Sequence, residues 1–239
     1  MARRKLAKAA KPKKYFISHV ASVGSDKGTR ELFPSLPYII SGGKVTERYY
    51  FLHVSKESER KFRVIPEFFG KESNFVQEFP KDIKKILKGD PEAKVFCVFD
   101  WDTIYQNKTN LEKYNSFVKR VQSFIDKGSV TLCPSMPSFE YWFMLHFRNT
   151  TRLVRTCEEM VKELKPYMGS YFSKKDIDLF KVLKNHHDME NPNWFRRLCA
   201  DGKLDSAIKR AEDNIKAAEK AGDLANQSYS YVYKAFKER

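Results

Sequence analysis

The sequence predicts an α/β fold in which a mostly parallel four-stranded sheet, flanked by helices, is followed by an all-helical C-terminal region. Short apolar runs alternate with segments of helical periodicity up to about residue 150, which is typical of parallel strands joined by helical crossovers. The clearest run, 95–99, is apolar throughout, as expected for a central strand that helices cover on both faces. No convincing strand follows residue 150.

The first two strands are predicted at 38–40 and 62–65, where short apolar runs end at turn-forming residues. The first run ends at Gly42–Gly43, and Thr46 is then expected to cap a helix through its side-chain oxygen. Pro66 stops the second run because proline has no backbone N–H to donate to a ladder. A tight glycine turn is therefore expected directly after the first strand.

Periodicity predicts the elements that follow. A helix over 75–87 leads to the strand at 95–99. Apolar residues at steps of three and one then form an amphipathic stripe over 111–125, which predicts a surface helix. A strand at 130–133 and a buried, aromatic-rich helix over 138–147 complete the alternating pattern.

The C-terminal part is expected to be helical. Helical patterns cover 152–164, 173–184, 204–221 and 229–236. The predicted organisation is a basic, flexible tail, an α/β catalytic domain and a helical region packed on that domain. These three parts are 1–35, 36–150 and 151–239.

The charge of the chain indicates a polyanionic partner. A formal net charge of +15 over 239 residues favours nucleic acid, or less often an anionic membrane surface. The first fourteen positions contain seven Lys and Arg residues and no acid. This segment could be a solvated tail, or an electrostatic arm for nucleic acid, or both. No apolar stretch approaches the roughly 20 residues of a membrane span. With no secretion signal and four scattered cysteines, a cytoplasmic protein without a zinc site is expected.

Four carboxylates follow the predicted strands on one edge of the sheet. Glu47 follows the glycine turn, Asp100 and Asp102 follow the third strand, and Glu140 begins the helix after the fourth. In open parallel sheets, ligands bind beyond the carboxyl ends of the strands. Acids that meet there repel one another, and Mg²⁺, with Mn²⁺ as an alternative, is the usual compensation because it prefers hard oxygen ligands. The sequence therefore predicts a metal site made of these four carboxylates.

Such a metal site suits chemistry on phosphodiesters. A bound ion can neutralise the phosphate and activate a water, so Glu47, Asp100 and Asp102 are the candidate catalytic residues. An acid that follows a strand is also often a helix cap or a turn former. Glu140 could instead serve the helix dipole or pair with a basic residue.

Three segments resemble the RloB family of bacterial abortive-infection proteins, and their acidic motifs resemble the Toprim domain of topoisomerases, primases and OLD-type nucleases. The segments are 43–51 (Gly-Lys-Val-Thr-Glu, then Tyr-Phe), 98–102 (Val-Phe-Asp-Trp-Asp) and 137–147 (Pro-Ser-Phe-Glu-Tyr-Trp, then Leu-His-Phe). The resemblance covers about 36–239, and its third segment is the most specific.

The resemblance implies a function. Toprim relatives bind Mg²⁺ and make or break phosphodiester bonds, which implies Glu47 as an acid–base group or metal ligand and Asp100 and Asp102 as metal ligands. It also implies a role in phage defence beside an ATPase partner of the RloA or ABC type, and nucleic acid, tRNA included, as the substrate. Gly42 and Thr103 stand where the family often has further acids, so one metal or two remains open.

Basic and aromatic residues near these segments are further candidates. Lys44, Arg148 and Arg152 could contact a nucleic-acid backbone, or could be solvated surface charges. His146 is interpreted as a packed core histidine. The segment 194–197 (Trp-Phe-Arg-Arg) could stack on single-stranded bases, although packing of the helical region is the simpler interpretation.

Three functions are compatible with the sequence. The first is a metal-dependent nuclease that acts as a defence effector on RNA or DNA. The second is a nucleic-acid-binding or regulatory subunit without catalysis, with or without homo-oligomer formation. The third is a phosphatase with an aspartyl nucleophile, suggested by an apolar strand that ends in Asp-x-Asp-Thr.

Overall fold

A five-stranded sheet organises the computed structural model, which describes residues 36–65, 78–172 and 177–237. Its strand order is β2-β1-β3-β4-β5. The first four strands are parallel to their neighbours, and β5 is antiparallel to β4. The bounds are β1 (Tyr38–Ser41), β2 (Arg63–Ile65), β3 (Val95–Asp100), β4 (Val130–Met136) and β5 (Tyr229–Ser230). The predicted α/β class with a mostly parallel sheet is confirmed.

The fifth strand corrects the prediction of a helix over 229–236. Ser230 pairs with Ser135 of β4, and their hydroxyl groups hydrogen bond at 2.8 Å. Only the following residues, Val232–Phe236, coil, as the 3₁₀ helix η4. A strand of two residues is too short to produce a detectable alternation, and its partner lies about ninety residues away in the chain.

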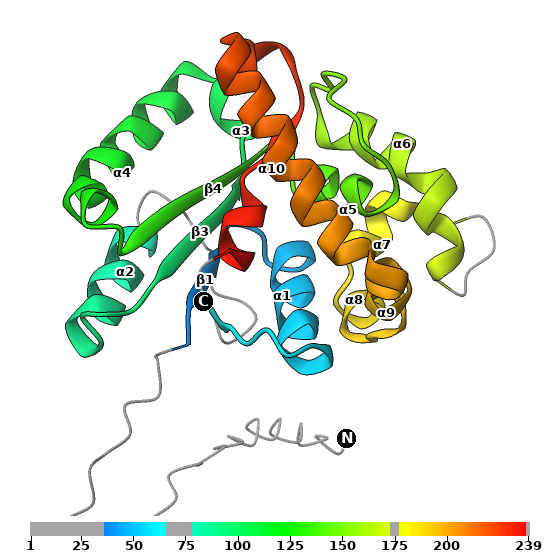
Figure 1. Cartoon of the computed structure of the whole chain (residues 1–239), viewed down its shortest axis with the longest axis horizontal. Coiled ribbons are helices and arrows are strands. Elements are labelled where there is room, and N and C mark those ends of the chain that lie inside the picture. Colours follow the sequence, from blue (N-terminus) through cyan, green and yellow to red (C-terminus); the bar gives the residue numbers. More distant parts are fainter. Residues whose placement is uncertain (1–35, 66–77, 173–176, 238–239) are drawn as a thin grey trace, which may run out of the picture. The chain divides into compact units, whose positions relative to one another are not determined.

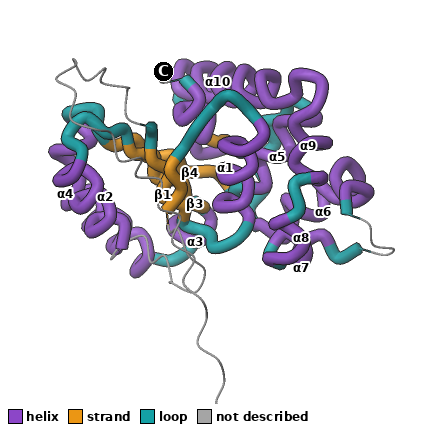
Figure 2. The backbone as a smooth tube through the Cα atoms, turned by 90° about the horizontal axis from the view of Figure 1, so that it is seen from below, coloured by secondary structure: helices purple, strands orange, loops and turns teal. Residues whose placement is uncertain are grey.

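The two faces of the sheet pack against different helices (Figures 1 and 2). The helices α2 and α4 pack on one face, with α3 at its edge, and α1, α5 and α10 pack on the other. Alternation along β3 supplies both cores: Val95, Cys97 and Phe99 face α2 and α4, whereas Phe96 and Val98 face α1 and α5. The bounds are α1 (Thr46–Glu57), α2 (Glu78–Gly89), α3 (Asp102–Tyr105), α4 (Lys108–Asp126) and α5 (Glu140–Phe147).

The residues after α5 share one hydrophobic core with α1 and α5. Their helices are α6 (Cys157–Met168), α7 (Leu179–Leu183), α8 (His186–Glu190), α9 (Asn193–Cys199) and α10 (Lys203–Ala221). Three further 3₁₀ turns are η1 (Gly169–Tyr171), η2 (Ala200–Gly202) and η3 (Leu224–Asn226). In the described part of the chain, no helix combines the length and the apolar character that a membrane crossing requires.

Several predicted boundaries are wrong for local reasons. The helix expected from 152 begins at Cys157, because Thr156 caps it by accepting from the backbone N–H of Glu159. The helices α8 and α9 were not predicted, since five and seven residues are too few for a clear period. The predicted basic tail, residues 75–77 of one helix and 173–176 of another lie outside the described residues.

Thr46 does not cap α1 as predicted. The N-cap position is Val45, which has no side-chain capping bond. The Thr46 hydroxyl instead donates to the carbonyl oxygen of Leu183 at 2.8 Å. This buried hydrogen bond joins the first turn of α1 to the end of α7, and tertiary structure thus overrides a local capping signal.

Candidate active site

The four predicted carboxylates lie together at the carboxyl ends of the parallel strands. Asp100 ends β3, Asp102 begins α3, Glu140 begins α5, and Glu47 stands in the first turn of α1. A pocket of about 280 Å³ opens between them, lined by Gly43, Lys44, Val45, Thr46, Glu47, Asp100, Glu140 and Lys184. Asp102 lies behind this lining and is close enough to Asp100 to act on its charge. The predicted acidic edge of the sheet is therefore a buried cluster.

The glycine turn explains how Glu47 enters this pocket. The N–H of Gly42 donates to the carbonyl oxygen of Val98 at 2.7 Å, which holds the turn against β3. A Cβ atom on Gly42 would lie only 3.2 Å from the Cβ of Phe99. A Cβ atom on Gly43 would overlap the carboxylate of Glu47 itself. Both glycines thus stand at close approaches, Gly42 to the neighbouring strand and Gly43 to the acid.

Backbone groups hold the acid at the end of β3. Asp100 Oδ1 accepts a hydrogen bond from the N–H of Phe139 at 2.8 Å. The N–H groups of Trp101 and Asp102 both donate to the carbonyl oxygen of Pro137, at 3.1 and 3.0 Å. The end of β3 is therefore fixed to the segment that joins β4 to α5, which also carries Glu140.

Glu140 and Asp102 share a neighbour, Cys157. Glu140 Oε2 accepts from the Ser138 hydroxyl at 2.6 Å and from the Cys157 thiol at 3.4 Å. Asp102 Oδ2 accepts from the N–H of Cys157 at 3.1 Å, whereas Asp102 Oδ1 is buried without a hydrogen-bond partner among the described residues. Glu140 thus belongs to the cluster, and a role limited to the helix dipole does not account for its contacts.

The burial of these acids changes their protonation. Burial raises the pKa of Glu47 to about 7, and repulsion by Glu140 adds to this shift. Burial also raises the pKa of Asp100 well above its ordinary value, with further repulsion from Glu47 and Glu140. The pKa of Asp102 is raised by burial as well, although the N–H of Cys157 opposes the shift. In the metal-free protein, ionisation of these carboxyl groups therefore costs free energy.

Lys184 was missed by the sequence analysis. It follows α7, lines the pocket, and carries its ammonium group 5.1 Å from the centre of the Phe180 ring. Burial lowers the pKa of Lys184, but the negative charge of the cluster, Glu140 above all, outweighs this and raises it. Nothing in the sequence joins a lysine of the helical region to an acidic turn about 140 residues earlier, so only the fold shows it.

The donor set fits a hard divalent cation in its chemistry. All four acids are carboxylates, and the unpartnered oxygen of Asp102 is the kind of atom that a cation would satisfy. As the side chains stand, no group of three or more His, Cys, Asp or Glu residues within 36–65, 78–172 and 177–237 is arranged to hold a metal ion. Cation binding would thus require the side chains of the cluster to move from their present positions.

Comparison with known families identifies the chain. The model of the RloB-like proteins matches residues 38–238. The chain belongs to the RloB-like family. The resemblance to the RloB family is confirmed over these residues. Searches of curated proteins and of solved structures gave no match.

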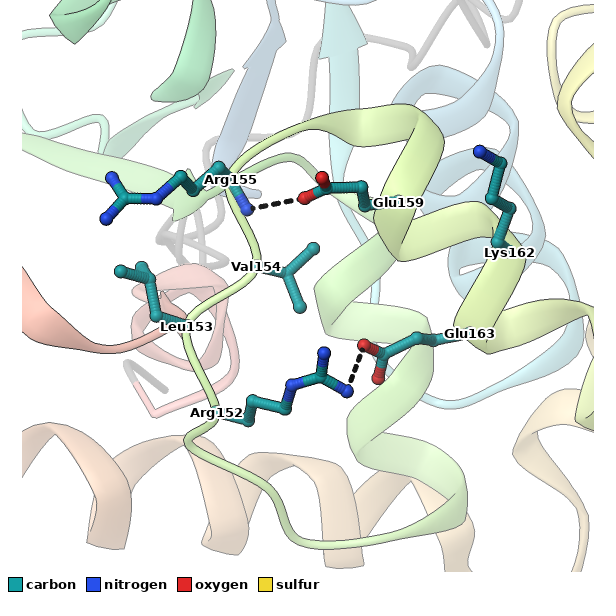
Figure 3. Close-up of a pocket in the computed structure, with 7 residues that line it drawn as sticks. All are labelled: Arg152, Leu153, Val154, Arg155, Glu159, Lys162 and Glu163. Carbon is teal, nitrogen blue, oxygen red and sulfur yellow. Dashed lines mark hydrogen bonds and ion pairs between the residues drawn. The ribbon is translucent and has the colours of Figure 1, made fainter.

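The basic candidates of this RloB-like protein differ in their surroundings. Lys44 lines the acidic pocket. Arg148 and Arg152 both pair with Glu163, at 3.1 and 3.0 Å, and Figure 3 shows Arg152 turned toward that carboxylate beside a second pocket. In this second pocket of about 490 Å³, the guanidinium of Arg155 makes no ion pair with a described residue. Lys44 therefore lies at the acidic cluster, whereas Arg148 and Arg152 share one carboxylate, that of Glu163, away from it.

The aromatic and histidine candidates of this RloB-like protein are core residues. His146 is 2% exposed and hydrogen bonds to Tyr50 and to the carbonyl oxygen of Trp142, and burial lowers its pKa to about 3. Trp194 and Phe195 are 1% and 3% exposed and pack under α1 and α5. The packing interpretations of these residues are confirmed, and neither aromatic ring is available for stacking on bases.

Proposed function

We propose that this RloB-like protein is a Mg²⁺-dependent nuclease that hydrolyses phosphodiester bonds in RNA, tRNA included, or in DNA. One observation carries the proposal: Glu47, Asp100 and Glu140 come from different elements and line one pocket, with Asp102 behind them and two lysines in the same lining. Burial of like charges costs several kcal/mol per ion unless a cation compensates it, and structural stability alone gives no reason to retain such a cluster.

The chain's own residues suggest a division of roles. Glu47, Asp100, Asp102 and Glu140 would hold the ion, which supplies charge neutralisation at the phosphate and a more acidic water. A carboxyl group that is not bound to the ion can instead accept or release a proton as a general base or acid, and Glu47 is the candidate for that role. The Phe139 N–H and the Ser138 hydroxyl keep Asp100 and Glu140 turned toward the pocket.

The biological setting proposed here follows from the family. Proteins of this kind are expected to act in the cytoplasm as effectors of bacterial anti-phage abortive infection, with a Toprim-like catalytic region and an ATPase partner of the ABC type. A nuclease that is always active would cleave the nucleic acid of its own cell. This is the reason to expect a partner that keeps the activity low. A homo-oligomer is equally compatible with the present structure.

A second candidate is a nucleic-acid-binding or regulatory subunit without catalysis. The observation that favours it is the absence, within the described residues, of three side chains already arranged for a metal ion. An aspartyl phosphatase is the weaker alternative, because Asp100 Oδ1 is engaged by the Phe139 N–H in a cluster of acids that would repel a phosphomonoester.

Purified protein incubated with bulk tRNA, single-stranded DNA and plasmid, in Mg²⁺, Mn²⁺ or EDTA, tests the proposal. We expect cleavage that requires the metal and that Asp100→Asn lowers at least about 10³-fold, since the variant keeps the acceptor for Phe139 but loses the charge. Asp126→Asn, on the exposed end of α4, is the matched control and should cleave normally. Equal cleavage by the Asp100 variant, or in EDTA, would exclude this metal site as the catalyst.

A second prediction concerns the glycine turn. Gly43→Ala places a methyl group where the Glu47 carboxylate lies, so we expect this carboxylate to be displaced and cleavage to fall about 10²-fold or more without loss of the fold. Gly89→Ala is the control, because a Cβ atom there meets nothing within 4 Å. Circular dichroism of both variants tests whether the fold is kept, and their cleavage rates test the effect on activity. An alanine at Gly43 that left the rate unchanged would show that the position of Glu47 is not critical.

A further inference from the structure

Lys184 reaches the acidic pocket from the helical region, on the opposite side of the chain's predicted boundary at residue 150. It lines the pocket together with Glu47, Asp100 and Glu140, and part of the residue stays open to solvent although its ammonium group is partly buried. Among the described residues its ammonium group makes a cation–π contact with Phe180 but no ion pair. The cation therefore faces the carboxylates without being neutralised by direct contact with any of them.

The backbone fixes the position of this lysine with respect to Glu47. The Thr46 hydroxyl donates to the carbonyl oxygen of Leu183 at 2.8 Å, and these residues immediately precede Glu47 and Lys184. Thr46 and Leu183 are 4% and 0% exposed, so solvent does not compete for this hydrogen bond. The first turn of α1 and the end of α7 thus bring the Glu47 carboxyl group and the Lys184 ammonium group into the same pocket.

A second contact joins α1 to the next helix, α8. His53, about two turns after Thr46 in α1, hydrogen bonds to the carbonyl oxygen of Met189 in α8 at 2.8 Å. Lys184 and Asn185 form the joint between α7 and α8, and the Asn185 side chain caps α8 by accepting from the N–H of Asp188. Lys184 therefore lies at a joint between two helices, α7 and α8, that are each hydrogen-bonded to α1.

The charges around the pocket are arranged for a ligand that bears negative charge. Acids occupy the interior of the pocket, and two lysines, Lys44 and Lys184, line it from different elements. An anion alone is repelled by the acids, and a cation alone is repelled by the lysines. A phosphate group that binds together with a divalent cation would satisfy both, because the acids attract the cation and the lysines attract the phosphate.

We propose that the Lys184 ammonium group contacts a non-bridging oxygen of the phosphate that undergoes hydrolysis, so that the helical region supplies a catalytic residue. This inference rests on the proposed nuclease function and names a residue of that same site. Negative charge grows on the phosphate oxygens as a water oxygen attacks phosphorus, and a fixed ammonium group favours that state. Lys184 stays protonated throughout and transfers nothing.

A purely structural role makes different predictions. If Lys184 only balances the acids in the metal-free protein, its removal should tighten divalent cation binding and leave nucleic-acid binding unchanged. If it contacts the phosphate, its removal should weaken the binding of nucleic acid and slow cleavage, whatever happens to the metal. The two roles are therefore separated by measuring metal binding and nucleic-acid binding in the same variants.

The experiment compares Lys184→Met and Lys184→Arg with the control Lys181→Met. Lys181 lies three residues earlier, is 82% exposed and pairs with Asp178, away from the pocket. Mn²⁺ binding is measured by calorimetry. Binding of fluorescein-labelled single-stranded RNA and DNA is measured by anisotropy in Ca²⁺, and cleavage is measured under single-turnover conditions in Mg²⁺.

We expect Lys184→Met to retain Mn²⁺ affinity within about threefold or to improve it, to bind the oligonucleotide at least about fivefold more weakly, and to cleave about 10²-fold more slowly. Lys184→Arg should recover part of both losses. Oligonucleotide affinity equal to that of Lys181→Met would overturn the inference. The binding measurement needs no cleavage, so an inactive wild-type protein would count against the nuclease while leaving the Lys184 contact to be decided by affinity alone.

Discussion

Replacement of Glu47 by glutamine is expected to stabilise the metal-free protein at pH 8 and to abolish cleavage at the same time. Glu47 is 4% exposed, and its burial raises its pKa to about 7 from the ordinary value of 4.5. Above pH 7 the folded protein holds this carboxylate charged, buried and beside Glu140. In the unfolded chain the same carboxylate is solvated and distant from Glu140, so its charge costs less free energy there. Glutamine keeps the shape and a carbonyl acceptor but carries no charge.

The sign of the pH dependence follows from the direction of the shift. Between about pH 4.5 and pH 7 the folded protein binds more protons at Glu47 than the unfolded chain does, so the wild-type free energy of unfolding falls as pH rises through this window. The glutamine variant lacks this loss. Its stability relative to the wild type should therefore be greater at pH 8 than at pH 5 by roughly 2–3 kcal/mol. The loss of the repulsion between Glu47 and Asp100 acts in the same direction.

Urea denaturation in EDTA at both pH values measures this difference. The control Glu158→Gln removes an exposed carboxylate at the start of α6 and should change the free energy of unfolding little at either pH. Addition of Mg²⁺ at pH 8 should stabilise the wild type and narrow the gap to the glutamine variant. If the two proteins differed in free energy of unfolding by the same amount at pH 5 and pH 8, the charged form of Glu47 would not destabilise the fold. The energetic argument for a cation in this pocket would then fail.

The acidic cluster could be predicted from the sequence because it depends on a general property of parallel sheets. Glu47 and Asp100 follow strand signals that are strong locally, and parallel strands bring their carboxyl ends to one edge whatever the details of packing. Glu140 follows from the same property. The role of Gly43 also has a local origin, since the atom that it must avoid belongs to a residue four positions later.

Other parts of the site have no local signal. Lys184 enters the pocket because Thr46 bonds to Leu183 rather than capping its own helix, a choice that depends on contacts 137 residues apart. The pairing of Arg148 and Arg152 with Glu163 likewise requires α6 to fold back beside the loop that joins it to α5. Sequence periodicity reports the face that an element buries, but not which distant element covers that face.

Replacement of Trp142 by alanine is expected to destabilise the sheet and the helical region together, by about 3–5 kcal/mol. Trp142 is fully buried in α5 and stacks on Phe236 of η4, with ring centres 5.7 Å apart. It also meets His146 at 5.3 Å and Tyr50 of α1 at 6.3 Å, both edge to face. One side chain thus joins the helix beside the acidic cluster to the C-terminal end of the described chain.

The size and extent of this effect test how the chain is divided. A boundary near residue 150, as the sequence predicts, would allow two parts to unfold separately, whereas a shared core requires one cooperative transition. Hydrogen exchange should show β3 and α10 losing protection together in Trp142→Ala, with Leu111→Ala, at a side chain that is 37% exposed on α4, as the mild control. If α10 lost protection while β3 kept it, the helical region would be a separate domain, and the acidic pocket with Lys184 would lie on the interface between two domains.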